Sequence, residues 1–402
     1  MAQLEGYGNE FKLKYLYLDK LFGDRLDRPP KGKKSKKVSD VNIFINFESL
    51  YNLVRRKDNE KVIANADKKE LKLIYRTAIS EFINVAAHYR EYFKRHKVRT
   101  NIFYYFNELE EEYVDYNNSA FIPGYRNHFI ESTTALNRMT LNSLIADSVP
   151  FMRIIAEYID SLYMVGTKRV EASLIPFIIL MSGKYPANIN MIITKDEYDY
   201  QYVNYNFLMI TRYQGDPIVL TKKNMMSFYR HKRKLFDTDK KPVREINSLL
   251  LPFIQCFEGD KKRSIPGIKG YGFKTVYREL EGLYEAGYIF DEEPDTMSIG
   301  NLCDVLSMYG AEVFQNQYLK DDLLNTYKAY DFEYQYSVVS SGQKEHIFDQ
   351  LKNRSDPAGL MELNERYFEY SPLMVLELNN YNSRTELGKY LEKGEDDEDV
   401  DE

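Results

Sequence analysis

The residues with the clearest chemistry lie in the segment SIPGIKGYGFKTVYREL. Three glycines there let the backbone come close to a ligand: Gly267, Gly270 and Gly272. Lys274 and Thr275 then open an amphipathic helix, whose first N–H groups and dipole favour an anion. Lys274 adds a positive charge that can follow phosphates without reading base sequence. The pattern therefore predicts that this segment grips the phosphates of a nucleic-acid backbone.

Apolar runs on both sides of this segment predict the elements that position it. INSLLLPFIQCF before it and TVYRELEGLY after it both have helical character, so residues 246–285 are interpreted as a helix–hairpin–helix. A monovalent cation at the hairpin is a further candidate ligand. The alternative is a glycine-rich helix connection without any ligand, because short glycine motifs often match by chance.

Upstream of the hairpin, predicted strands and helices alternate. The β-branched and aromatic runs VNIFINF, VRTNIFYYF and INMIIT predict buried strands. Apolar residues at helical spacing predict a helix over 71–97. VEASLIPFIILMSG predicts another helix that ends at Gly183, with Pro176 favouring a late start or a kink. FLMIT and PIVLT predict a hairpin that extends the sheet. This alternation favours an α/β fold with a mostly parallel central sheet and flanking helices.

These elements divide the chain into four predicted parts. A folded α/β part is followed by a helical region, and segments of biased composition lie at both ends. The parts are an N-terminal arm and basic linker at 1–40, the α/β domain at 41–225 with a polar, arch-like insertion near 107–150, the helical region at 226–390, and an acidic, disordered tail at 391–402.

The charge of the chain is unevenly distributed. The formal net charge is −6, but the tail EKGEDDEDVDE holds eight acids and one lysine, which leaves the rest of the chain at about +1. Overall acidity therefore does not exclude a nucleic-acid partner, with DNA favoured over RNA. The basic run RHKRKLFDTDKK at 230–241 is predicted to contact the backbone. The acidic tail is a candidate docking site for a protein partner.

Composition also bears on location. No run approaches the roughly 20 apolar residues of a membrane helix, and the N-terminus has no signal-peptide core, so no membrane partner is expected. Two cysteines, Cys256 and Cys303, are too few for a disulfide framework and favour a reducing, cytoplasmic compartment. With 35 Tyr and no Trp, the composition suggests an AT-rich genome and a viral protein, which would then act in the host cytoplasm.

Taken in order, these segments resemble the flap endonuclease and 5′-exonuclease family, part of the PIN-like nuclease fold. In that family a segment G-D-x-x-D-N-I-P-G runs into the hairpin, and this chain has GDKKRSIPG at the same place. The resemblance covers roughly residues 41–285. It implies clustered carboxylates that hold Mg²⁺ or Mn²⁺ ions and activate water for phosphodiester cleavage.

Several acidic positions of the family hold other residues in this chain. The departures are Asn46, Phe106, Ser173, Leu174, Tyr198 and Arg263. The metal candidates that remain are Glu171, Asp196 and Asp260, with Glu48 and Glu108 as substitutes from neighbouring positions. Asp199 lies one place beyond Tyr198 and is expected to point to another face. Phe106 and Leu174 are expected to make the floor of the site apolar.

Three scattered acids are too few to hold two metal ions roughly 3.5–4 Å apart. Arg263 is expected to repel metal and to favour phosphate. The resemblance thus implies a pseudoenzyme that still binds nucleic acid and has no assigned cofactor. A single weak Mg²⁺ site at these acids is the alternative. The residues predicted to bind nucleic acid are Gly267, Gly270, Gly272, Lys274, Thr275, Arg263 and, by resemblance to a basic arch residue, Arg126.

Three functions follow from these alternatives. The first, which the missing carboxylates favour, is a DNA-binding or scaffold component of a larger assembly that does not cleave. The second is an active, metal-dependent 5′ nuclease with a rearranged site around Glu171, Asp196, Asp260 and Glu48. The third is a structural protein that binds a protein partner and has lost nucleic-acid binding as well.

Overall fold

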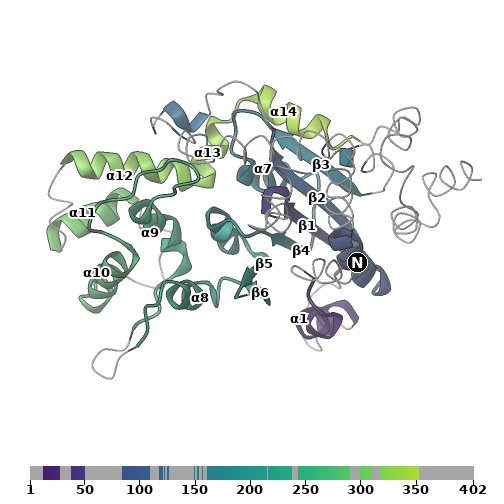
Figure 1. Cartoon of the computed structure of the whole chain (residues 1–402), viewed down its shortest axis with the longest axis horizontal. Coiled ribbons are helices and arrows are strands. Elements are labelled where there is room, and N and C mark those ends of the chain that lie inside the picture. The colour runs from purple at the N-terminus through teal and green to yellow at the C-terminus, as the bar shows by residue number, and fades with distance from the viewer. Residues whose placement is uncertain are drawn as a thin grey trace, which may run out of the picture.

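A six-stranded sheet lies at the centre of the computed structural model, and a group of helices extends from one side of it (Figure 1). The strands are ordered β3-β2-β1-β4-β5-β6. Their bounds are β1 (Asp40–Asn46), β2 (Arg99–Asn107), β3 (Leu162–Thr167), β4 (Ile189–Ile193), β5 (Phe207–Tyr213) and β6 (Asp216–Leu220). The structure describes residues 12–27, 38–49, 84–108, 117–120, 122, 125, 149, 152–153, 156, 161–214, 216–237, 243–289, 299–309 and 317–352.

Neighbouring strands run parallel except for the last pair. β1 pairs in parallel with β2 and β4, β2 pairs with β3, and β4 pairs with β5. β5 and β6 form the antiparallel hairpin that FLMIT and PIVLT predicted. The predicted fold class, a mostly parallel sheet with flanking helices, is therefore confirmed. Because parallel strands end at the same side of a sheet, the residues that follow β1 to β4 meet there.

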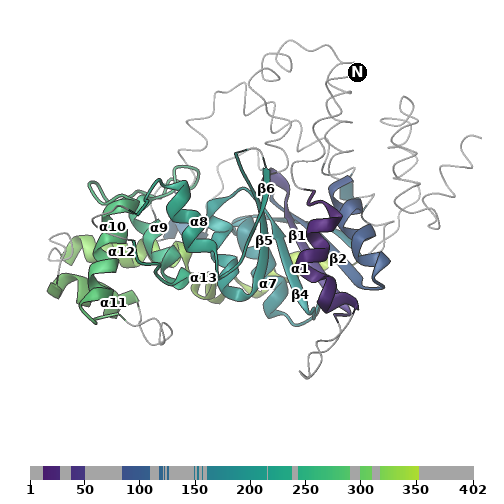
Figure 2. The same cartoon turned by 90° about the horizontal axis from the view of Figure 1, so that it is seen from below.

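The strands divide the core into two clusters, one on each face of the sheet. Along β2, Phe103 and Tyr105 belong to one cluster and Tyr104 and Phe106 to the other, because successive side chains of a strand point to opposite faces. α7 (Ile175–Met181) packs on the first face. α1 (Tyr15–Asp27) and a helix at 84–95 supply buried side chains on the second face, and Figure 2 shows α1 against the strands.

The later part of the described chain is mostly helical. α9 (Leu251–Glu258) is its central helix, and α10 (Phe273–Glu285) and α12 (Gln317–Tyr330) pack against it. The other helices are α8 (Met225–Lys232), α11 (Ile299–Tyr309), α13 (Phe332–Val338) and α14 (Ser341–Asp349), and the short 3-10 helices are η1 (Asn117–Ala120), η2 (Ala172–Leu174), η3 (Glu197–Tyr205) and η4 (Ser248–Leu250). Within the described part of the chain, no helix is both long and apolar enough to cross a bilayer.

The predicted segments are described to different extents. Of the helix predicted over 71–97, the described part is helical at 84–95. The helix predicted to end at Gly183 starts late, as η2 followed by α7 with Pro176 in its first turn, and Gly183 has a φ of 64°. Arg126, the acidic tail, and most of the predicted linker and insertion lie outside the described residues.

Both outer strands of the sheet carry a feature that limits pairing at the free edge. Beside β3, the side-chain amide of Gln350 bonds to both backbone groups of Gly166. Gly166 N donates to Gln350 Oε1 at 2.8 Å, and Gln350 Nε2 donates to Gly166 O at 2.9 Å. At the opposite edge β6 contains Pro217, which has no N–H to donate.

Candidate functional site

The ends of four parallel strands bring polar residues to one side of the sheet. β1 ends at Asn46 and β2 ends at Asn107, while the turn after β3 leads to Glu171, which precedes η2. Asp196 follows β4 and caps η3, where its side chain accepts a hydrogen bond from Tyr198 N. Glu171 and Asp196, two of the acids retained at family positions, therefore face the same region.

Arg263 lies between the retained acids. Its Nη2 is 3.2 Å from Glu171 Oε1 and 2.8 Å from Asp196 Oδ2, and its Nη1 is 2.6 Å from Asp260 Oδ2. The side chain of Arg263 is 0% exposed. Nη2 also donates to Ser173 Oγ at 3.3 Å. The three acids that the sequence analysis treats as scattered thus converge on one guanidinium.

The burial of Arg263 corrects its predicted role. The sequence predicts that Arg263 contacts nucleic acid, because a guanidinium is a good partner for phosphate. In the structure the guanidinium is buried and its Nη atoms are engaged by three carboxylates. A phosphate in solvent does not reach it without displacing these partners. Arg263 therefore belongs to the interior of the site.

The turn that carries Arg263 is fixed by backbone contacts. Asp260 N donates to Ile265 O, and Ile265 N donates to Asp260 O, each at 2.9 Å. Gly259 has a φ of 70°, and a Cβ added to it would lie 2.4 Å from Gly267 N. A residue with a side chain does not fit where the two backbones approach so closely. A Cβ added to Gly267 would lie 2.6 Å from Glu258 O, so the lack of a side chain at both glycines lets the turn pack against the end of α9.

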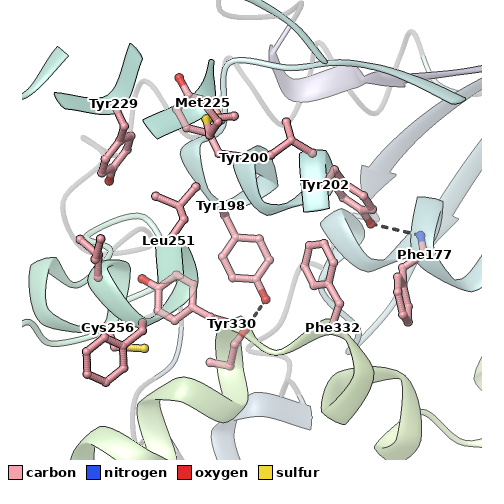
Figure 3. Close-up of a cluster of buried hydrophobic side chains, with 14 of the residues drawn as sticks. Phe177, Tyr198, Tyr200, Tyr202, Met225, Tyr229, Leu251, Cys256, Tyr330 and Phe332 are labelled. Carbon is pink, nitrogen blue, oxygen red and sulfur yellow. Dashed lines mark hydrogen bonds between the residues drawn. The ribbon is translucent and has the colours of Figure 1, made fainter. Parts of the chain in front are cut away.

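The ring of Tyr198 covers one side of the guanidinium. Arg263 Cζ is 4.0 Å from the centroid of this ring, which is a cation–π arrangement. Figure 3 shows Tyr198 within an aromatic cluster, where its hydroxyl donates to Ala329 O and its ring packs against Tyr330 and Phe332. This cluster ties η3 to α12 and α13 and holds Tyr198 against Arg263.

Lys262, the residue before Arg263, is a second cation at the site. Its Nζ is 2.9 Å from Asp196 Oδ2 and 2.8 Å from Glu48 Oε2. Glu48 also accepts a hydrogen bond from Asn107 Nδ2 through Oε1, at 3.0 Å. Glu48, which the sequence analysis names as a substitute ligand, is therefore in the group, and Asp196 is shared between the two cations.

The two cations set the protonation of the carboxylates. Burial by itself would raise the pKa of Asp196, but the charges and hydrogen bonds of Arg263 and Lys262 outweigh it and hold that pKa well below its usual value. Burial would lower the pKa of Arg263, but Asp196, Glu171 and Asp260 together raise it well above the usual value. The centre is therefore a set of charged groups at neutral pH.

Asp199 corrects a second expectation, because it points into the site and not to another face. It is 0% exposed, and its Oδ2 accepts from Asn46 Nδ2 at 3.2 Å, Tyr105 Oη at 2.9 Å and Thr194 Oγ1 at 2.5 Å. The reason is that η3 is a 3-10 helix, in which residues three apart lie above one another. Burial, together with the charge of Asp196, raises the pKa of Asp199 to about 6.

The register of β2 corrects the assignment of Phe106. Phe106 packs against Phe47 in the cluster on the opposite face of the sheet, so it does not form the floor of the site. Its neighbours Tyr105 and Asn107 face the site instead, and Asn107 Oδ1 accepts from Ala172 N at 3.0 Å. An amide at the end of β2 thus stands where the sequence comparison placed an aromatic ring.

Glu108 and Leu174 are the remaining positions singled out from the sequence. Glu108 Oε1 pairs with Arg153 Nη2 at 2.5 Å, and its side chain lies near Gly166 in β3. This places its carboxylate with Arg153 and not with the acids around Arg263. Leu174 is buried in the hydrophobic cluster of the α7 face, as an apolar floor requires.

The predicted phosphate-binding residues lie on the exposed connection between α9 and α10. Their exposed members are Gly267, Gly270, Gly272, Lys274 and Thr275. Gly270 has a φ of 89°, a conformation that favours glycine. Gly272 caps α10, and Thr275 N donates to Gly272 O at 3.0 Å. The first N–H groups of α10 point out of its N-terminus, as they do in any helix.

The basic run at 230–241 is largely turned inward where it is described. Arg233 pairs with Glu197 at 2.6 Å and with Glu258 at 2.7 Å. Lys232 pairs with Glu197 at 2.7 Å, and Arg230 donates to a backbone carbonyl. These ion pairs flank a cavity of about 400 Å³ whose lining also includes Asp196 and Lys262. Among the described residues of this run, the basic side chains that are exposed and open to the predicted contact with nucleic acid are His231 and Lys234.

The donor set of the site can be compared with the needs of a divalent metal ion. Among the residues that the structure describes, no group of three or more His, Cys, Asp or Glu side chains is arranged to hold a metal. Oxygens of Glu171, Asp196 and Asp260 already accept N–H groups of Arg263, and a positive charge fills the space between them. A cation is repelled from that space. The residues present therefore do not fit a two-metal site.

The chain is similar to solved structures at low sequence identity. No protein-family model and no curated protein matches it. A flap endonuclease of bacteriophage T5, solved as a pseudo-enzyme–product complex with DNA and metal ions, has a TM-score of 0.50 and 14% identity over 77% of this chain and 98% of that chain. A zinc-bound T5 5′-exonuclease has a TM-score of 0.46 and 13% identity over 82% and 98%.

The likeness to the T5 flap endonuclease defines the class of fold. The order of the parallel strands, the flanking helices and the near-complete coverage of the T5 flap endonuclease show that this chain has a flap-endonuclease-like fold. The resemblance found in the sequence therefore extends to the fold.

Proposed function

We propose that the protein binds DNA on a flap-endonuclease-like fold without metal-dependent cleavage, as a DNA-binding or scaffold component of a larger assembly. The observation that carries the proposal is the guanidinium of Arg263 among Glu171, Asp196 and Asp260. A buried positive charge lies among the acids that, by the sequence resemblance, correspond to metal ligands. Catalysis through metal-activated water is therefore not supported by these side chains.

The proposed DNA-binding site lies on the connection between α9 and α10. Gly270, Gly272, Lys274 and Thr275 are exposed there, beside the N-terminus of a 13-residue helix. Backbone N–H groups, the helix dipole and the Lys274 ammonium all favour phosphate. The T5 structure named as a pseudo-enzyme is a complex with DNA, which supports DNA as the ligand of a non-cleaving protein of this fold.

Cleavage is tested with a labelled 5′-flap substrate and a labelled duplex, each with Mg²⁺ or Mn²⁺. We expect no cleavage above the level of a preparation that carries both Asp196→Ala and Asp260→Ala. The matched variants matter because a contaminating nuclease would cleave equally in both preparations. Cleavage by the natural chain that disappears in Asp196→Ala and in Asp260→Ala would show an active 5′ nuclease and refute the proposal.

Binding is tested by fluorescence anisotropy with labelled duplex, flap and single-stranded DNA over a range of salt concentrations. Lys274→Ala should weaken binding to all sequences alike and reduce the slope of log K against log salt by about 1, because one phosphate contact is lost. Lys20→Ala is the control, since Lys20 is exposed on α1. Equal binding by Lys274→Ala and the natural chain would remove the hairpin from the proposed DNA site.

A further inference from the structure

Four carboxylates and two protein cations share one space beside the sheet. Arg263 contacts Glu171, Asp196 and Asp260, and Lys262 contacts Asp196 and Glu48. Every N···O distance in this group is between 2.6 and 3.2 Å. Asp196 accepts from both cations, so the group is one connected centre and not two separate ion pairs.

The charges explain why the centre needs cations. Carboxylates gathered in a poorly solvated space repel each other strongly unless positive charge lies between them. Exposed fractions of the side chains are 0% for Arg263, 1% for Glu171, 9% for Asp196 and 19% for Asp260, so water screens the charges around Arg263 little. Glu48 and Lys262 are 20% and 30% exposed and lie at the outer side of the centre. Arg263 and Lys262 together carry a charge of +2, the charge of a single divalent metal ion.

We propose that Arg263 and Lys262 form a built-in cation centre, which holds Glu48, Glu171, Asp196 and Asp260 in the way that a divalent metal ion would hold them. Removing the guanidinium leaves an oxygen-lined hollow that takes up Mn²⁺ or Mg²⁺, because hard divalent cations prefer several carboxylate oxygens. The centre is thus a latent metal site that the protein's own arginine closes. This inference concerns the ion centre alone and does not depend on DNA binding.

The ring of Tyr198 makes the centre more favourable for a guanidinium than for a metal ion. Its ring lies 4.0 Å from Arg263 Cζ, and its hydroxyl is directed away, to Ala329 O at the end of α12 (Figure 3). The ring therefore presents an apolar face with negative quadrupole to the guanidinium and offers no oxygen to a metal ion. A planar, weakly hydrated cation gains from this face, whereas a small hydrated ion does not. Tyr198 is a positioning residue for Arg263.

The first test compares the natural chain, Arg263→Gln and Arg263→Lys, all full length and without DNA. Thermal unfolding is measured in EDTA and with Mn²⁺, and bound Mn²⁺ is counted by the loss of the free-ion signal in electron paramagnetic resonance. Arg263→Gln should unfold at lower temperature in EDTA and bind one Mn²⁺. At Mn²⁺ about 100-fold above its Kd, its unfolding temperature should rise by roughly 5 °C. The natural chain should show neither effect, and Arg263→Lys, which keeps a positive charge in the centre, should bind no Mn²⁺.

The matched control is Arg233→Gln. Arg233 also pairs with two carboxylates, those of Glu197 and Glu258, but Lys232 remains beside them in the variant. It should lose stability without gaining Mn²⁺ binding. An equal response to Mn²⁺ by Arg233→Gln or by the natural chain would overturn the proposal, as would an Arg263→Gln chain that binds no Mn²⁺. If Arg263→Gln is unfolded in EDTA, refolding with Mn²⁺ should rescue it, and failure of that rescue counts against the latent site.

A second variant pair examines Lys262. Lys262→Gln alone leaves the guanidinium in place and should bind no Mn²⁺. Combined with Arg263→Gln, it should increase Mn²⁺ affinity about tenfold over Arg263→Gln alone, because a like charge is removed from the hollow. No gain in affinity would exclude Lys262 from the centre. Mn²⁺ binding by the natural chain would count against both the ion centre and the proposed function. An Arg263→Gln chain that binds no Mn²⁺ would refute the latent metal site alone, and DNA-binding results leave the ion centre untouched.

Discussion

Arg263 and Arg233 are two arginines with similar partners in different surroundings. Arg263 is 0% exposed and contacts three carboxylates, while Arg233 is 28% exposed and contacts two, those of Glu197 and Glu258. Removal of a buried ionic partner leaves uncompensated charge, whereas removal of a partly exposed one admits water. The difference teaches that access of water, more than the number of salt bridges, decides what each arginine contributes.

The largest expected effect is that of Arg263→Gln. We expect a loss of about 3–5 kcal/mol in the free energy of unfolding in metal-free buffer, because three carboxylates would share a buried space in which only Lys262, beside Asp196, remains as counter-charge. The loss in unfolding free energy is measured by chemical unfolding with guanidinium chloride at neutral pH. A loss below that of Arg233→Gln would reverse the comparison and show that the buried centre contributes little.

Substitutions of Tyr198 give the next largest effect, and two variants distinguish the contribution of its ring from that of its hydroxyl. Tyr198→Phe should cost about 1 kcal/mol, because only the hydrogen bond to Ala329 O is lost. Tyr198→Leu should cost about 2–3 kcal/mol, because the aromatic face over Arg263 is lost as well. In an Arg263→Gln background the difference between the two variants should shrink. Equal losses in both backgrounds would mean that Tyr198 acts without Arg263.

Arg233→Gln should have a smaller effect, about 1–2 kcal/mol, because water solvates Glu197 and Glu258 once their partner is gone. High salt should narrow the difference between this variant and the natural chain, since a partly exposed ion pair is screened. The loss caused by Arg263→Gln should change little under the same conditions. Salt titration of both variants by chemical unfolding tests the contrast directly.

Acid gives the smallest and most selective effect. Burial would raise the pKa of Glu197, but Lys232 and Arg233 hold it below the usual 4.5, so its contribution to stability is present above pH 4.5 and is lost as pH falls through the lowered value. The pKa of Asp196 lies well below 3.8. As pH falls below 4.5 towards the lowered pKa of Glu197, the effect of Arg233→Gln should therefore shrink, while that of Arg263→Gln persists. Parallel losses would show that both centres titrate together.

The fold was largely predictable because hydrophobic patterns in the strands are local. VNIFINF, VRTNIFYYF and INMIIT all became parallel strands, and the order of these segments led to the flap-endonuclease-like fold. A buried strand needs a run of β-branched and aromatic residues, which a sequence displays directly. The hairpin of β5 and β6 was equally visible.

The details of the site were less predictable because they depend on register and on distant contacts. The sequence predicts that Phe106 lies at the site. In the structure its neighbours Tyr105 and Asn107 face the site, so Phe106 points to the opposite face of the sheet. The sequence predicts that Asp199 points to another face, because it does not show that η3 is a 3-10 helix. The contact between Tyr198 and α12 joins residues 131 positions apart and has no local signal. The basic residue Arg263 is visible in the motif GDKKRSIPG, but its burial is not.

The side-chain amide of Gln350 covers part of the sheet edge at β3. A strand from another molecule that approached β3 would need the N–H and C=O of Gly166, and an intramolecular amide already occupies both. One side chain thus occupies both backbone groups of a residue within the six-residue strand β3, and Pro217 withholds a donor on the far side. Copies of this chain should therefore resist growing into fibrils through their sheet edges, even at the high concentrations at which such growth begins.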